Sequence, residues 1–204
     1  MKPLLVVIVG VVSVGAMYLL FFATPSAVTN YPSDGATIVA FGDSLVEGVG
    51  ATTGNDFVSL ASQQIGEPII NLGRSGDTTR DGLSRLDEVL TQNPKIVIVL
   101  FGGNDYLRQI PPEETFQNLS TMIESIHETG AIVVLLGVRG GLLTDSYRGE
   151  YQAVVNTHNT AFVPDVLDGL FGQSSRMADP IHPNDVGYAI IADRVAPVIS
   201  ELNQ

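Results

Sequence analysis

Residues Ala36–Leu45 have the sequence ATIVAFGDSL, and this stretch decides the fold. The apolar run IVAF stops at Gly42, and Ser44 follows two residues later. A short buried apolar run that ends at a glycine predicts a central strand of an α/β sheet. Ligands and chemistry in such sheets gather at the carboxyl ends of the strands, so Ser44 lies where a nucleophile would be useful.

The same apolar pattern recurs along the chain. Runs at 68–72, 95–101 and 131–136 predict three more strands. Helical spacing of apolar residues predicts helices over 57–65, 83–90, 111–129 and 147–162, and from about 184 onward, where Pro197 is expected to kink or split the helix. Strands that alternate with helices imply right-handed crossovers and a parallel sheet covered on both faces. We therefore expect one α/β domain over residues 36–204, a three-layer α/β/α sandwich.

The composition restricts the function. With 204 residues and 45% hydrophobic content, the chain can form one domain with a large core. The 22 acidic residues outnumber the 10 basic ones and give a net charge of −12, so a nucleic-acid partner is not expected. There is no cysteine, hence no disulfide and no thiolate metal site. The sequence pattern suggests neither a metal nor a cofactor.

The first 27 residues differ from the rest. Leu4–Ala23 carries no charge, and at about 1.5 Å per residue it is long enough to span roughly 30 Å of hydrocarbon as a helix. The small-x-small cleavage sites that follow are poor, so we favour an uncleaved membrane anchor over a cleaved signal peptide. With Lys2 inside, the domain lies outside the cytoplasmic membrane, periplasmic or extracellular, and is secreted if residues 1–27 are removed. Residues 28–35 have the composition of a linker.

Each of the first three predicted strands ends in a glycine-containing turn. The turns cover 42–44, 73–77 and 102–105. In an open parallel sheet they lie side by side at one edge. They offer three hydrogen-bond donors for a developing oxyanion: the backbone N–H of Ser44, the backbone N–H of Gly76 and the side-chain amide of Asn104.

A carboxylate and an imidazole come late in the chain, as Asp179 and His182. Three residues apart, they can meet on one side of a tight turn. Asp179 would then hold one ring N–H, and the other ring nitrogen would accept the proton of Ser44. Of the other histidines, His158 lies on an apolar helical face and is expected in the core, whereas His127 is expected in solvent.

Four short motifs resemble the four blocks of the SGNH, or GDSL, hydrolases, and they occur in the order of that family. They are GDSL at Gly42–Leu45, SGDT at Ser75–Thr78, GGND at Gly102–Asp105 and DPIHPN at Asp179–Asn184. The turn sequences NLGRSGDTT and FGGNDYLRQIPPEET are most similar to the thioesterase I/lysophospholipase/arylesterase branch. The resemblance implies the SGNH hydrolase fold, which has a flavodoxin-like sheet.

The resemblance also implies the role of each site residue. Ser44 is the nucleophile, His182 the base and Asp179 its partner, while Ser44, Gly76 and Asn104 form the oxyanion hole. The implied activity is that of a serine esterase or thioesterase that hydrolyses carboxylic esters, lysophospholipids or acyl thioesters. Its partner is a small-molecule substrate, its catalytic domain is monomeric, and it needs no cofactor or metal.

Two other functions stay open at this point. One is a carbohydrate O-acetyl esterase of the cell envelope on the same fold. The other is a flavodoxin-like binding module without catalysis, which is disfavoured because no Gly-Lys-Ser/Thr follows the first strand. The loop at 137–149 departs from the family pattern, although it should border the acyl pocket, so the substrate is left open. Tyr106, Leu107 and Ile110 either line that pocket or pack within their loop.

Overall fold

The computed structural model describes residues 28–141 and 145–204, and these residues contain one parallel five-stranded sheet. Its strands are β1 (Thr37–Gly42), β2 (Ile69–Gly73), β3 (Pro94–Leu100), β4 (Ile132–Leu136) and β5 (Ala161–Val163). All neighbouring pairs are parallel, and the order is β2-β1-β3-β4-β5. This is the flavodoxin-like order, as expected.

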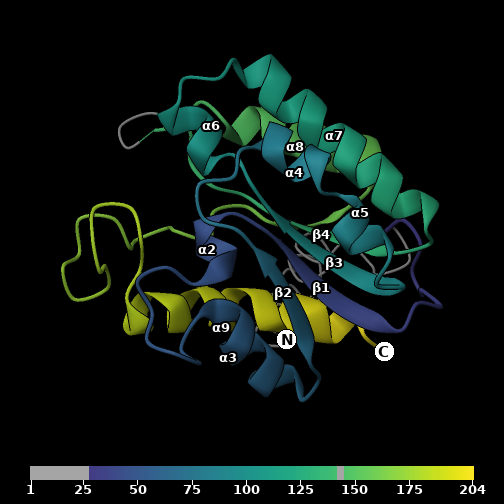
Figure 1. Cartoon of the computed structure of the whole chain (residues 1–204), viewed down its shortest axis with the longest axis horizontal. Coiled ribbons are helices and arrows are strands. Elements are labelled where there is room, and N and C mark those ends of the chain that lie inside the picture. The colour runs from purple at the N-terminus through teal and green to yellow at the C-terminus, as the bar shows by residue number, and fades with distance from the viewer. Residues whose placement is uncertain (1–27, 142–144) are drawn as a thin grey trace, which may run out of the picture.

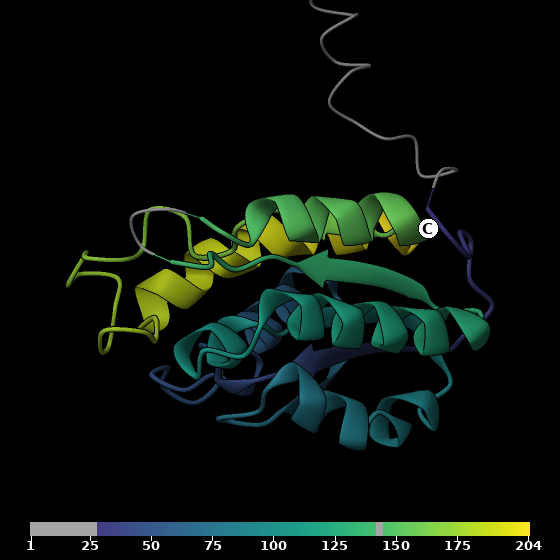
Figure 2. The same ribbon diagram turned by 90° about the horizontal axis from the view of Figure 1, so that it is seen from above.

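Helices cover both faces of the sheet (Figure 1). One face carries α3 (Phe57–Ile65) and α9 (Asp185–Leu202). The other carries α4 (Thr79–Ser84), α5 (Asp87–Leu90), α7 (Pro112–Glu128) and α8 (Arg148–His158). Figure 2 shows α8, α7 and α4 side by side in this second layer. The strands β1, β3 and β4 lie between two apolar layers, which is why they are almost continuously apolar.

Two short helices begin directly at strand ends. Helix α2 (Ser44–Glu47) follows β1, and its first turn is capped by the Asp43 side chain, which accepts from the Leu45 N–H at 3.0 Å. Helix α6 (Gly103–Leu107) follows β3 through Gly102, whose φ is 116°. A Cβ at Gly102 would lie 2.7 Å from the Tyr151 hydroxyl, so the turn requires glycine. Both helices lie at the same edge of the sheet as the loop before α9 (Figure 1).

Three predicted elements differ from the structure. The helix expected over 147–162 was wrong at its end, because α8 stops before Asn159, which has a φ of 52°, and 161–163 form β5. The helix expected over 83–90 is instead the two short helices α4 and α5. At the C-terminus, α9 runs through Pro197 without being split.

Residues 28–35 lie against the domain. The Thr29 N–H donates to the Asn159 carbonyl at 3.0 Å, and the Asn30 amide donates to the carbonyls of His127 and Ala131, both at 2.9 Å. The apolar helix expected within residues 1–27 lies outside the described residues. Among the helices of 28–141 and 145–204, none is both long and apolar enough to cross a membrane.

Candidate active site

Ser44, His182 and Asp179 lie in one row of hydrogen-bonding contacts. Ser44 is the first residue of α2, at the carboxyl end of β1, and is 7% exposed. Its Oγ lies 3.1 Å from Nε2 of His182. On the other side of the ring, Nδ1 of His182 lies 2.7 Å from Oδ2 of Asp179. The structure thus brings together three residues that the sequence separates by up to 138 positions.

The turn before α9 holds the histidine locally. Oδ1 of Asp179 accepts the backbone N–H groups of Ile181 and His182, each at 2.8 Å. The hydrogen bond with the His182 ring, followed by that from the Ile181 N–H, lowers the pKa of Asp179 to about 2. Asp179 therefore carries a full negative charge at neutral pH. A charged carboxylate at Nδ1 favours the tautomer whose Nε2 is free to accept a proton from Ser44.

The predicted oxyanion donors occupy neighbouring loops. Asn104 lies in the first turn of α6, and its Nδ2 donates to the Asp77 carbonyl at 2.9 Å. Gly76 lies one residue before Asp77 and has a φ of 84°, a conformation that favours glycine. Since an amide nitrogen carries two hydrogens, Asn104 keeps one donor for another acceptor.

A cavity of about 580 Å³ opens beside Ser44. Ser44, Asn104 and His182 line it, whereas Gly76 is not among its lining residues. Most of its walls are apolar: Leu45, Tyr106, Leu107, Val138, Leu167, Phe171, Pro180 and Ile181. Tyr106 and Leu107 thus border the cavity, while Ile110 borders a neighbouring hollow. As predicted, the loop after β4 contributes to the wall, through Val138, Arg139 and Gly141.

Residues 40–190 match the GDSL-like Lipase/Acylhydrolase family. The chain belongs to this family. It is therefore a GDSL-type hydrolase, and not a flavodoxin-like binding module.

Several characterised proteins are similar over most of this hydrolase. Esterase TesA of Pseudomonas aeruginosa is 32% identical over 178 residues, which cover 81% of this chain and 89% of TesA. The arylesterase of Vibrio mimicus is 32% identical over 171 residues, or 78% of this chain and 86% of the arylesterase. Thioesterase 1/protease 1/lysophospholipase L1 of Escherichia coli is 28% identical over 175 residues, or 81% and 84% of the two chains.

Solved structures agree with this assignment. The crystal structure of TesA superposes with a TM-score of 0.75 at 32% identity, and the match covers 82% of this chain and 99% of TesA. The SGNH-hydrolase family esterase AlinE4 gives a TM-score of 0.64 at 30% identity, with 82% of this chain and 96% of AlinE4 covered.

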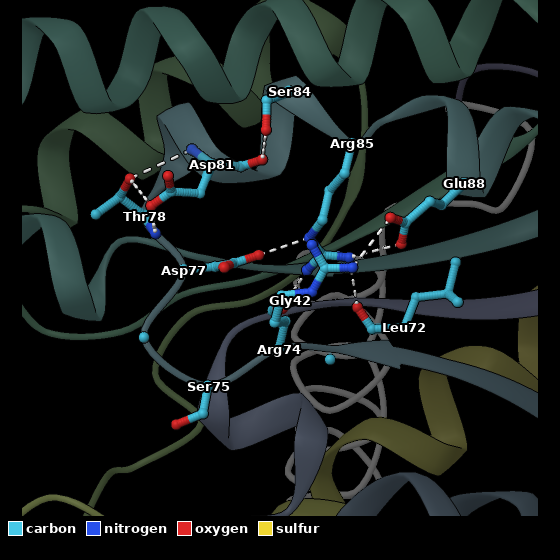
Figure 3. A network of polar contacts seen from close by, with 12 residues as sticks. Gly42, Leu72, Arg74, Ser75, Asp77, Thr78, Asp81, Ser84, Arg85 and Glu88 are labelled. Atoms are coloured by element: carbon cyan, nitrogen blue, oxygen red, sulfur yellow. Dashed lines mark hydrogen bonds and ion pairs between the residues drawn. The ribbon is translucent and has the colours of Figure 1, made fainter.

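A buried arginine connects the strand ends of this hydrolase near the site (Figure 3). Arg85 donates to the Gly42 carbonyl at 2.8 Å and to the Leu72 carbonyl at 2.9 Å, and it pairs with the Asp77 carboxylate. Its guanidinium also lies 4.4 Å from the centre of the Phe41 ring. Arg85 thereby holds the ends of β1 and β2 and the loop that carries Gly76. Sequence reasoning missed it, because an arginine beside apolar helix positions is normally solvated.

Asp105 connects α6 to α4 and α7 by hydrogen bonds. It is fully buried, and it accepts the Thr79 N–H at 3.0 Å as well as the hydroxyls of Thr79 and Thr115. On the solvent side, Nη2 of Arg108 donates to the Gly76 carbonyl at 2.7 Å. Asp105 thus ties α6 to α4 and α7, whereas the part played by Arg108 has no signal in the sequence.

Asp43 is a second buried carboxyl next to Ser44. Burial, opposed in part by the hydrogen bond from the Leu45 N–H, raises the pKa of Asp43 to about 7, and the charges of Asp105 and Asp77 add to the rise. The group therefore does not carry a full charge at neutral pH.

Within 28–141 and 145–204, no group of three or more His, Cys, Asp or Glu residues could hold a metal ion.

Proposed function

We propose that this GDSL-type hydrolase cleaves carboxylic esters or acyl thioesters of small molecules, with Ser44 as its nucleophile. The observation that carries the proposal is the 3.1 Å contact between Ser44 Oγ and His182 Nε2. A hydroxyl becomes a competent nucleophile when a base lies within hydrogen-bond reach and a third group orients that base. Asp179, 2.7 Å from the other ring nitrogen, fills the third position.

The reaction proceeds in two halves. Ser44 Oγ attacks the acyl carbonyl while His182 takes its proton, and the tetrahedral intermediate collapses when His182 protonates the leaving alcohol or thiol. An acyl-serine remains. His182 then removes a proton from water, which attacks the acyl-serine. As the bond between the acyl carbon and Ser44 Oγ breaks, His182 returns the proton to Oγ and the carboxylic acid leaves.

The negative charge of the tetrahedral intermediate needs donors that are already in place. Ser44 and Gly76 would supply backbone N–H groups, and Asn104 its amide. The support for this role is that Asn104 lines the same cavity as Ser44 and is held by the loop that carries Gly76. Fixed donors cost no reorganisation as the charge develops.

The walls of the cavity support an apolar acyl chain as the group bound next to Ser44. Leu107, Val138 and Phe171 offer such a chain contacts that remove it from water. The relatives' names, esterase, arylesterase and thioesterase/lysophospholipase, agree with a substrate of this kind. An acetylated carbohydrate is the second candidate, but it would leave most of the apolar wall unused.

We further propose that residues 1–27 anchor the protein to the cytoplasmic membrane, with a monomeric domain over 36–204 outside it and 28–35 between the two. The support is the uncharged sequence of Leu4–Ala23. The protein is then expected in the membrane fraction at its full length. Protein that begins near Val28 in the extracellular fraction would instead demonstrate cleavage.

The proposed activity is tested with p-nitrophenyl esters of rising acyl length, lysophosphatidylcholine, an acyl-coenzyme A and an acetylated sugar. We expect the longer p-nitrophenyl esters to exceed the acetate in kcat/KM. Ser44→Ala should lower kcat on the order of 10⁶-fold, as for other serine nucleophiles. A Ser44→Ala protein as active as the wild type would refute the proposal, and faster turnover of the acetylated sugar than of every acyl ester would favour the second candidate.

A further inference from the structure

One cation faces the apolar cavity. Arg139 follows β4 by three residues, and among the lining residues of the cavity it is the one arginine or lysine. Its side chain is 34% exposed, so about two thirds of it is buried. Within the described part of the chain, its guanidinium donates no hydrogen bond, and its one ion-pair contact is with Asp165. A guanidinium has five N–H donors, and burying it with these donors unused is costly.

The ion pair between Arg139 and Asp165 is a loose one. Nε of Arg139 lies 3.9 Å from Oδ2 of Asp165, which is beyond hydrogen-bond distance. Oδ1 of Asp165 is already occupied, since it accepts the Leu167 N–H at 3.0 Å. Burial raises the pKa of Asp165, and the nearby arginine lowers it too little to offset this. A close ion pair with Arg139 would instead lower the pKa of Asp165 below its usual value.

We propose that Arg139 binds an anionic group of the substrate, a carboxylate or a phosphate, and that this hydrolase selects esters or thioesters that combine an apolar chain with a negative charge. The inference rests on the proposed function of the cavity. A planar guanidinium fork matches both carboxylate and phosphate with two parallel hydrogen bonds. Because the whole chain has a net charge of −12, its general field repels anions, and an anionic substrate needs a local cation.

Asp43 is the one carboxyl group among the described residues that line the cavity, and with a pKa of about 7 it does not carry a full negative charge at neutral pH. His182 is engaged by Asp179 and Ser44. Arg139 is thus the lining residue that an anion would meet as a fixed positive charge.

The test compares kcat/KM for two matched ester pairs. One pair carries the charge on the acyl side: mono-p-nitrophenyl adipate against p-nitrophenyl hexanoate. The other carries it on the leaving group: the hexanoyl ester of 4-hydroxybenzoate against that of 4-hydroxybenzamide. In one pair, Arg139→Gln should lower kcat/KM for the anionic ester at least roughly tenfold more than for its neutral partner, which is the size of a charge-assisted hydrogen bond. The pair that responds identifies the end of the substrate that carries the anion.

Three variants separate anion binding by Arg139 from effects of its packing and of net charge. Arg139→Lys keeps the charge and loses the fork, so it should retain part of the preference. Asp165→Asn keeps an acceptor for the Leu167 N–H and should retain the whole preference. Arg80→Gln removes a charge that is 71% exposed, pairs with Glu114 and lies outside the cavity, so it should leave the preference unchanged.

The inference is overturned if Arg139→Gln changes charged and neutral esters equally in both pairs, which would indicate a structural role. It is also overturned if Arg80→Gln produces the same loss, since the effect would then come from net charge. Failure of the proposed function has a different signature: Ser44→Ala would match the wild type on all four esters.

Discussion

The two sides of the active site are held in different ways. On one side, residues 73–85 and 102–108, here called the braced half, carry Gly76 and Asn104. Buried charges fix this half: Arg85 to the ends of two strands, and Asp105 to α4 and α7. On the other side, residues 172–184, here called the exposed half, carry Asp179 and His182. The turn at 179–182 is held by hydrogen bonds within itself, from the backbone N–H groups of Ile181 and His182 to the Asp179 carboxylate, and it faces solvent.

The contrast follows from what each group does in the proposed mechanism. Oxyanion donors act only if they are fixed before the charge appears, so the core must hold them. A base needs a partner at one ring nitrogen and reach to the serine at the other, and a local turn can provide both. We therefore expect substitutions of the functional side chains in the exposed half to change chemistry alone, and substitutions of the side chains that hold the braced half to change chemistry, stability or both.

Asp179→Asn, in the exposed half, should lower activity more than any substitution in the braced half. The new side chain can still accept the N–H groups of Ile181 and His182 through its oxygen, so the turn keeps its shape. Its NH₂ group would face the ring nitrogen and favour the wrong tautomer of His182. We expect kcat to fall about 10⁴-fold.

The control for this variant is its thermal unfolding, which should match that of the wild type because the Asp179 side chain is 44% exposed. Activity within tenfold of the wild type would mean that the carboxylate does not orient the histidine.

In the braced half, Arg85→Met should mainly reduce stability. The Arg85 side chain is 5% exposed, and its loss leaves the Asp77 carboxylate buried without its partner. Removal of one member of a buried ion pair costs about 3–5 kcal/mol. Chemical denaturation should show a loss of this size in the free energy of unfolding.

Arg176→Gln is the matched change in the exposed half. Arg176 donates to the Gly169 carbonyl at 2.9 Å on the surface, and its replacement should cost no more than about 0.5 kcal/mol. If Arg85→Met and Arg176→Gln lowered the free energy of unfolding equally, the two halves would not differ in how they are held.

Asn104→Ala should lower kcat about 10²- to 10³-fold, the usual effect of removing one oxyanion donor. KM should change little, because the lost interaction forms in the transition state. Asn118→Ala is the control: it removes a 3.0 Å hydrogen bond to the Thr79 hydroxyl in the same half, away from the cavity. If both variants lose activity equally, Asn104 acts through structure and not as a donor.

The smallest effect should come from Arg108→Gln. In the proposed mechanism Arg108 is a positioning residue, since its hydrogen bond to the Gly76 carbonyl holds the loop that carries a proposed donor. We expect kcat to fall about tenfold, the worth of one charge-assisted hydrogen bond, with KM and the melting temperature unchanged. The side chain is 56% exposed, so its removal leaves no buried gap. As the control, Arg80→Gln should change neither kcat, KM nor the melting temperature. If Arg108→Gln lowered the melting temperature but not kcat, the positioning role would be contradicted.

The sequence predicted the turn that carries Asp179 and His182, and the strand ends, better than the buried side chains that hold the braced half. Asp179 and His182 stand three residues apart, and Ser44 follows a clear apolar strand that ends at a glycine. These local patterns were enough to place the three residues near one another. Arg85 was missed because its burial depends on strand ends that are distant in sequence. No local pattern separates it from a solvated arginine.

The fifth strand was missed for a similar reason. Residues 161–163 form a strand of three residues, and Phe162 continues the apolar face of the preceding helix. Two features end the helix and make 161–163 a strand. One is local, the positive φ of Asn159, and the other is a tertiary contact, the pairing with β4. The four strands predicted from longer apolar runs are all present.

The central claim is that Ser44, activated by His182, is the nucleophile that faces the braced donors. The most direct test is mass spectrometry of the full-length protein after reaction with a fluorophosphonate ester. The account predicts one phosphonyl adduct, on the peptide that contains Ser44, and none in His182→Ala. An adduct on Ser75 instead, or continued ester hydrolysis with Ser44 unlabelled, would contradict it.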